Sequence, residues 1–259
     1  MFFVGPRDEQ SEAITQLHTN LKSVLFTKQY TIAEITALFD SMPDREYYNK
    51  WGGRYANAIA PANDRPGSNL FLMSWQSLAY DLMTTYEFLH NHQYEWVLSV
   101  RPDMDFATPL PPVDVLRKAR ERHGHEKVVW VMNSNQHYMG VTDRFAIMSR
   151  NASDVYFGRW KAMLAGTFAS QVNYTQCGDC NSERMLKMWL ESFGVPIKGM
   201  PPVGAIKCSD AKYCTKETPC FTSCDDGRKY KYDDGNPANE WAVTAGFRNS
   251  FKGWNANML

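Results

Sequence analysis

Two carboxylates one residue apart, Asp103 and Asp105, are the residues of this chain best suited to chemistry. They follow the apolar run 96–100, which we expect to be a short buried strand, and then Arg101-Pro102. Pro102 lacks an amide donor and biases the residue before it towards an extended conformation, so the strand should end there. Open α/β sheets bind ligands at the carboxyl ends of their strands. Two hard oxygen donors in that place suit Mg²⁺ or Mn²⁺, which leave coordination sites for substrate phosphates.

The same acidic pair also fits a solvated surface turn, so the motif alone leaves both interpretations open. A wider sequence pattern favours the metal site over the surface turn. Residues 69–106, which include Gln76 and the motif Arg101-Pro-Asp-Met-Asp-Phe106, resemble the core of nucleotide-sugar glycosyltransferases with the A-type (GT-A) fold. Asp143-Arg-Phe-Ala-Ile and Ser182-Glu-Arg-Met-Leu resemble further blocks of that group. In those enzymes an Asp-x-Asp motif at a strand end holds a divalent cation against the donor diphosphate.

The resemblance implies a fold class and a reaction. The fold would be α/β, with a GT-A-like (Rossmann-like) mixed sheet flanked by helices and a Cys-rich C-terminal excursion. Residues 1–259 would form a single domain, with a nucleotide-sugar-binding core over 1–176 and an acceptor-side helix and Cys-rich segment over 177–259. The reaction would be metal-assisted, inverting transfer of a sugar from a nucleotide-sugar donor to a hydroxyl of a glycan or glycoprotein acceptor.

On the donor side, the resemblance assigns Mn²⁺ or Mg²⁺ to Asp105 with help from Asp103. Arg101 and Asp103 would contact the nucleotide sugar, since the forked donors of arginine suit phosphates. Gln76 would be a polar residue near the donor; the alternative is an exposed helix position. Many metal-dependent relatives also use a late histidine, yet no histidine follows His137 here, so the third metal ligand stays open.

On the acceptor side, Glu183 and then Asp143 are the candidates for the general base that takes the proton of the acceptor hydroxyl. Glu183 lies in the first turn of a predicted helix over 182–193, which Gly194 ends. A first-turn glutamate is also what the helix dipole favours, so a purely structural role is the alternative. For Asp143 and Arg144 the alternative is a surface ion pair, which would contribute almost nothing to stability.

The elements that must position these residues follow from hydrophobic periodicity. Residues 142–149 read as a strand in which Phe145 and Ile147 alternate inward, and residues 40–67 as a long surface loop rich in Pro, Gly, Asn and aromatic residues. Thr31-Ile-Ala-Glu34 is a capping box that opens a helix. We expect the remaining strands at 1–5, 128–132 and 203–206, and the remaining helices at 8–26, 74–90, 113–122 and 152–168.

Bulk composition excludes some function classes. Hydrophobic residues make up 44% of the 259 residues and the formal net charge is zero, without a strongly basic stretch, which argues against a nucleic-acid-binding protein. No apolar run reaches the roughly 18 residues of a membrane-spanning helix. The start, Met1-Phe-Phe-Val-Gly5, is too short for a signal peptide, so we expect a cytoplasmic protein or a catalytic domain of a longer precursor.

The cysteines bear on that choice. All six lie in the stretch 177–224, which suggests a disulfide framework of undetermined pairing; the alternative is zinc, although Cys177-Gly-Asp-Cys180 has no second pair at the usual spacing. Glycosylation sequons at Asn151 and Asn173 are compatible with the secretory route. We therefore expect the Golgi or another secretory lumen, with the cytoplasm as the alternative.

Two other functions fit parts of the pattern. A glycoside hydrolase needs two carboxylates on either side of the scissile bond, and Asp103 or Asp105 with Glu183 would supply them. A non-catalytic carbohydrate-binding module stapled by disulfides would explain the cysteines and the 14% aromatic content. Such a module would bind sugar without regard to nucleotide or metal.

Overall fold

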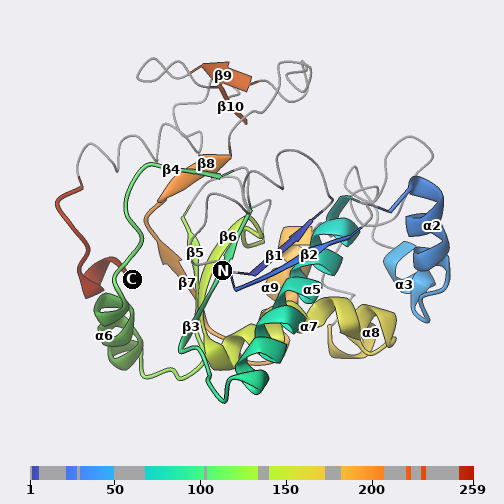
Figure 1. Cartoon of the computed structure of the whole chain (residues 1–259), viewed down its shortest axis with the longest axis horizontal. Coiled ribbons are helices and arrows are strands. Elements are labelled where there is room, and N and C mark those ends of the chain that lie inside the picture. The colour runs from blue at the N-terminus through green and yellow to red at the C-terminus, as the bar shows by residue number, and fades with distance from the viewer. Residues whose placement is uncertain are drawn as a thin grey trace. The chain divides into compact units, whose positions relative to one another are not determined.

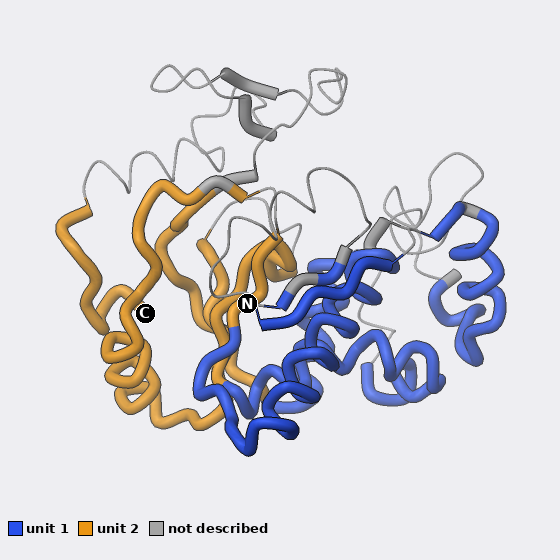
Figure 2. Tube along the Cα trace, in the orientation of Figure 1, with its two compact units in different colours: residues 1–97, 150–194 blue, residues 98–149, 195–259 orange. Residues whose placement is uncertain are grey.

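The computed structural model describes residues 2–5, 22–27, 30–49, 68–101, 104–133, 140–172, 182–206, 220–222, 229–231 and 251–259. The described residues form both helices and strands, which confirms the α/β class (Figure 1). The chain divides into two compact units (Figure 2). Unit 1 comprises Met1–Val97 and Arg150–Gly194, and unit 2 comprises Leu98–Ser149 and Val195–Leu259. The single domain expected from the resemblance, divided at residue 176, stays a prediction.

Unit 1 is mainly helical. Its strands β1 (Phe2–Gly5) and β2 (Ser23–Phe26) form a parallel pair. Its helices are α2 (Ile32–Asp40), α3 (Arg45–Asn49), α5 (Ser68–Leu89), α7 (Arg150–Leu164), α8 (Phe168–Gln171) and α9 (Ser182–Ser192). The capping box predicted at the start of α2 is confirmed, because Thr31 Oγ1 accepts from the amide of Glu34 while the Glu34 carboxylate accepts from the amide of Thr31.

Two expectations for the N-terminal part of unit 1 are wrong. A helix over 8–26 was predicted, but residues 23–26 form β2; residues 6–21 lie outside the described residues. The run Val-Leu-Phe at 24–26 favours a strand, and pairing with β1 outweighs the helical spacing of its apolar residues. Residues 40–67 were predicted to be a loop, but Arg45–Asn49 form α3; residues 50–67 lie outside the described residues.

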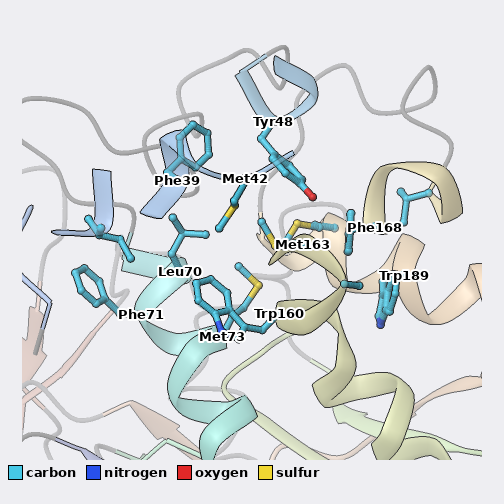
Figure 3. Packing of buried hydrophobic residues seen from close by; sticks show 14 residues of the cluster. Phe39, Met42, Tyr48, Leu70, Phe71, Met73, Trp160, Met163, Phe168 and Trp189 are labelled. Atoms are coloured by element: carbon cyan, nitrogen blue, oxygen red, sulfur yellow. The ribbon is translucent and has the colours of Figure 1, made fainter. Parts of the chain in front are cut away.

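The core of unit 1 is built where α2, α3, α5, α7, α8 and α9 bring aromatic and methionine side chains together (Figure 3). Phe168 stacks on Trp189, with ring centroids 4.9 Å apart. Tyr48, from α3, is 1% exposed and packs against Phe168 and Phe39. Burial, with the nearby Asp44 carboxylate, raises the pKa of the Tyr48 hydroxyl. Of the aromatic residues in the predicted loop, Tyr48 therefore belongs to the core and Tyr47 packs against it.

Unit 2 is built around a four-stranded mixed sheet with the order β3-β6-β5-β7 (Figure 1). The strands are β3 (Trp96–Val100, whose first two residues belong to unit 1), β5 (Val129–Met132), β6 (Phe145–Ser149) and β7 (Ile197–Met200). β5 runs antiparallel to β6 and parallel to β7. A second, antiparallel pair joins β4 (Met104–Phe106) to β8 (Gly204–Ile206). The predicted strands at 128–132 and 203–206 are thus present with shifted ends.

All residues of β5 and β6 are buried. The predicted strand over 142–149 therefore begins later, at Phe145, and the expected alternation is wrong because both of its faces are covered. Helix α6 (Val113–His123) ends at Gly124, whose φ of +66° is the left-handed conformation of a helix cap. The short helix η3 (Ala256–Met258) lies against α6, where Arg122 donates to Asn257 and the Trp130 indole donates to the main-chain oxygen of Leu259.

Two further strands, β9 (Cys220–Thr222) and β10 (Lys229–Lys231), form an antiparallel pair in the Cys-rich stretch. The other five cysteines, and the side chain of Cys220, lie outside the described residues, so the predicted disulfide framework stays a prediction. In the described part of the chain, none of the helices is both long and apolar enough to cross a bilayer.

Candidate functional site

One edge of the unit 2 sheet gathers several of the polar residues that the sequence singled out. β3 ends there at Val100, as predicted, and the amide of Arg101 donates to the carbonyl of Arg144, just before β6 (3.0 Å). β5 and β7 are parallel, so both end at this edge, where the amide of Asn133 donates to the carbonyl of Met200 (2.7 Å). This is the carboxyl edge of β3, β5 and β7, the place where open α/β sheets bind ligands.

Asp143 and Arg144 lie buried at this edge, with 6% and 4% of their surfaces exposed. The alternative of a surface ion pair is therefore wrong. The residues between Val141 and β6 are all buried, and the hydroxyl of Thr142 accepts from the amide of Arg144 (3.3 Å). Burying a carboxylate and a guanidinium costs free energy unless both are hydrogen-bonded or paired, so an interior position for two such groups is a feature typical of functional sites.

The acidic motif continues from the same edge. Met104 donates its amide to the carbonyl of Arg101 (3.2 Å), and this bond links the end of β3 to β4. Asp105 is the central residue of β4, and its backbone pairs with Ala205 of β8. Asp103 and the side chain of Asp105 lie outside the described residues, so their roles as metal ligands stay predictions. The structure brings Arg101, the backbone of Asp105 and Asp143 together in unit 2.

Gln76 and Glu183 are the two predicted site residues that belong to unit 1. Gln76 is half-buried on α5, not exposed, and its side-chain oxygen accepts from the guanidinium of the buried Arg159 on α7. Glu183 is half-buried in the first turn of α9, and its Oε2 accepts from the hydroxyl of Ser182 (2.9 Å). The contact to Arg159 gives Gln76 a role in joining two helices, and the predicted contact to a donor would be additional to it.

Sequence reasoning missed one pair at the carboxyl edge, Asn133 and Gly199. The Asn133 side chain lies directly against Gly199, because a methyl group built at position 199 would be 1.9 Å from Asn133 Oδ1. Asn133 is exposed, and its side-chain amide makes no hydrogen bond to another described residue. A glycine inside a short strand is a signal for such a close approach, and Gly199 in β7 carries it.

The best-connected polar cluster of unit 1 centres on Arg150, the first residue of α7. Its guanidinium contacts both carboxylate oxygens of Glu87 (2.9–3.1 Å), Asp154 Oδ1 (3.0 Å) and the hydroxyl of Tyr80. Burial alone would lower the pKa of Arg150, but the hydrogen bonds to Glu87 and then Asp154 raise it above its usual range. Burial and the hydrogen bond to Asp154 raise the pKa of Tyr80. Each charged group of this cluster has a partner, which indicates that the cluster has a structural role and holds α5 against α7.

Among the described residues, no three His, Cys, Asp or Glu side chains are grouped so that they could hold a metal ion. Asp103 and the side chain of Asp105 lie outside these described residues. Comparisons with protein-family models, with curated proteins and with solved structures found no match to this chain.

Proposed function

We propose that this protein is a glycosyltransferase of the GT-A fold, which moves a sugar from a nucleotide-sugar donor to an acceptor hydroxyl. The observation that supports the proposal best is the gathering of Arg101, Asp143 and Arg144 at the carboxyl edge of the unit 2 sheet, next to the strand that carries Asp105. Two guanidinium groups and a carboxylate at such an edge suit a ligand with phosphate and hydroxyl groups.

In this proposal Asp105 and Asp103 hold Mn²⁺ or Mg²⁺, for which their hard oxygen donors are suited. The bound cation would supply charge neutralisation for the leaving diphosphate. Arg101, half-buried at the end of β3, pairs with phosphate oxygens. Glu183 or Asp143 takes the proton of the acceptor hydroxyl, and the carboxylate that does so must come within hydrogen-bond reach of that hydroxyl.

The test is a thermal-shift screen of UDP-, GDP- and CMP-sugars, with and without Mn²⁺, on the wild type and on Asp105→Ala. We expect one class of nucleotide sugar to raise the melting temperature in the presence of Mn²⁺, because a ligand that binds only the folded state stabilises it. Asp105→Ala should abolish the Mn²⁺-dependent part of the shift. Asp114→Ala is the matched control, because it removes an exposed carboxylate from α6 of the same unit.

Each competing function predicts a different result. The proposal fails if no nucleotide sugar stabilises the wild type, or if Asp105→Ala responds as the wild type does. A glycoside hydrolase would release sugar from a glycan without nucleotide and without Mn²⁺. A binding module would bind free sugar equally well whether or not a nucleotide is attached, and it would show no turnover.

A further inference from the structure

We propose that Asn133 is a ligand-binding residue of the carboxyl-edge site and that Gly199 determines how its amide is presented. The inference rests on the proposed function and adds a residue pair that the resemblance does not assign. The ligand chemistry is a neutral group that both donates and accepts hydrogen bonds, as a sugar hydroxyl or the edge of a nucleobase does. The side-chain amide of asparagine matches such a group with one acceptor oxygen and two donor hydrogens.

Asn133 has a fixed place in the sheet. It follows β5 directly, and its backbone is fixed to β7 by the bond from its amide to the carbonyl of Met200. Successive side chains of a strand alternate between faces, so Asn133 shares a face with Val131, whose partner in β7 is Gly199. Asn133 and Gly199 are therefore diagonal neighbours on one face, at the edge where Arg101 and Asp143 also lie.

The contact between Gly199 and the Asn133 side chain is close. A Cβ atom at position 199 would lie 1.9 Å from Oδ1, 2.6 Å from Cγ and 2.7 Å from Nδ2 of Asn133. The whole amide group thus occupies the space that any other residue at position 199 would fill. Because Gly199 has no side chain, the amide of Asn133 can lie directly against its backbone. A glycine costs strand stability, and this contact gives a reason for one inside β7.

The side-chain amide of Asn133 is also accessible to a ligand. Asn133 is exposed, and in the described part of the chain its side chain has no hydrogen-bond partner. An asparagine that served only to close the sheet would use its amide on neighbouring backbone groups, as capping and turn residues do. An amide that lies against Gly199, and that none of the described residues engages, is arranged for a partner beyond those residues.

The experiment compares dissociation constants of four variants by calorimetry: Asn133→Ala, Gly199→Ala, the double variant, and Gly158→Ala as a control. Gly158 lies in α7, where an added Cβ meets nothing within 4 Å. The probe is whichever of UDP-glucose, GDP-mannose and CMP-sialic acid gives the largest thermal shift with the wild type, and also its nucleotide alone. We expect each single carboxyl-edge variant to bind about tenfold more weakly, which is the size of one neutral hydrogen bond.

The double variant separates a shared cause from two independent ones. If Gly199 acts through the placement of Asn133, the double variant binds no more weakly than Asn133→Ala alone. Melting temperatures without ligand should be close to that of the wild type, because Asn133 is exposed. Weakened binding of the nucleotide alone would place Asn133 at the base, and weakened binding of only the intact nucleotide sugar would place it at the sugar; the inference stands in both cases.

Three results would overturn all or part of the inference, and each refutes a different claim. If the wild type binds a nucleotide sugar and both single variants bind it equally well, the role of Asn133 is refuted while the proposed function stands. If the wild type binds none of the three donors, the proposed function fails and the role of Asn133 fails with it. A double variant that loses the product of both single effects would refute the link from Gly199 to Asn133.

Discussion

At the scale of single residues, the ion pair between Arg150 and Glu87 has the largest expected effect on stability among the ion pairs of the described residues. Nη2 of Arg150 lies 2.9 Å from Oε2 of Glu87, and the two side chains are 13% and 7% exposed. Arg150→Ala leaves a buried carboxylate without its cation, which costs about 3–5 kcal/mol. The measurement is the free energy of unfolding in urea, and a loss below about 1 kcal/mol would contradict the buried geometry.

The same arginine offers its own control. Asp154 also contacts Arg150, at 3.0 Å, but its side chain is 64% exposed. Asp154→Ala should therefore cost no more than about 1 kcal/mol, as exposed ion pairs do. The contrast between two partners of one guanidinium separates the effect of burial from the effect of distance.

Spacing and resemblance singled out candidate residues for the site but did not predict which of them are buried. The carboxylates and Arg101 became candidates because the strand before them has a clear apolar pattern. The burial of Asp143 and Arg144 could not be predicted, since a charged pair reads as surface unless the elements around it are known. Asn133 was missed for a related reason: its position matters only through Gly199, which is 66 residues away and adjacent only because β5 and β7 pair.

At the scale of elements, we expect the substitution of glycine by alanine to change the free energy of unfolding in opposite directions at different helix positions. Gly158 lies inside α7, and a Cβ there meets nothing within 4 Å. Gly158→Ala should therefore raise the free energy of unfolding by about 0.5–1 kcal/mol, since glycine in a helix interior is that much less favourable than alanine. The measurement is urea denaturation, and a loss of stability would contradict the open space beside α7.

The two contrasting glycines end helices. Gly166 follows α7 with a φ of +70°, and a Cβ there would lie 2.8 Å from Cβ of Pro43. Gly124 ends α6 with a φ of +66° and meets nothing within 4 Å. Gly124→Ala should cost about 1–2 kcal/mol from the left-handed backbone alone. Gly166→Ala should cost more, because the contact with Pro43 adds to the same strain.

The elements that were predicted well are those with strong local signals. The capping box at Thr31 and the stripe and terminal glycine of α9 each fix a helix without help from distant residues. One error lies where a distant contact decides: residues 23–26 become a strand because β1 is beside them, and such a pairing leaves no periodic trace in the sequence. The other error is local. The predicted helix over 152–168 is split into α7 and α8 at Gly166, whose φ is +70°.

At the scale of the whole molecule, the cysteines connect stability to compartment. All six lie in the stretch from Cys177 to Cys224, and the secretory lumen expected from the sequence would favour disulfides among them. Asn151, one of the two sequon asparagines, is exposed in the first turn of α7, as a glycan would need. Its partner Ser153 is fully buried and hydrogen-bonded to the carbonyl of Arg150, so glycosylation there would have to precede the folding of α7.

The test is alkylation of the intact protein without reductant, followed by mass spectrometry. A disulfide framework predicts that none of the six cysteines is labelled, and that reduction lowers the free energy of unfolding by about 2–5 kcal/mol for each bridge that closes a small domain. A zinc site predicts labelling only after a chelator removes the metal, because bound thiolates are protected. Six labelled thiols in the untreated protein would refute the framework and favour a reducing compartment, since structural disulfides do not persist there. The three outcomes differ in the reagent that exposes the thiols. One sample is therefore divided into three portions, treated with reductant, with chelator or with neither, and the labelling pattern decides among the outcomes.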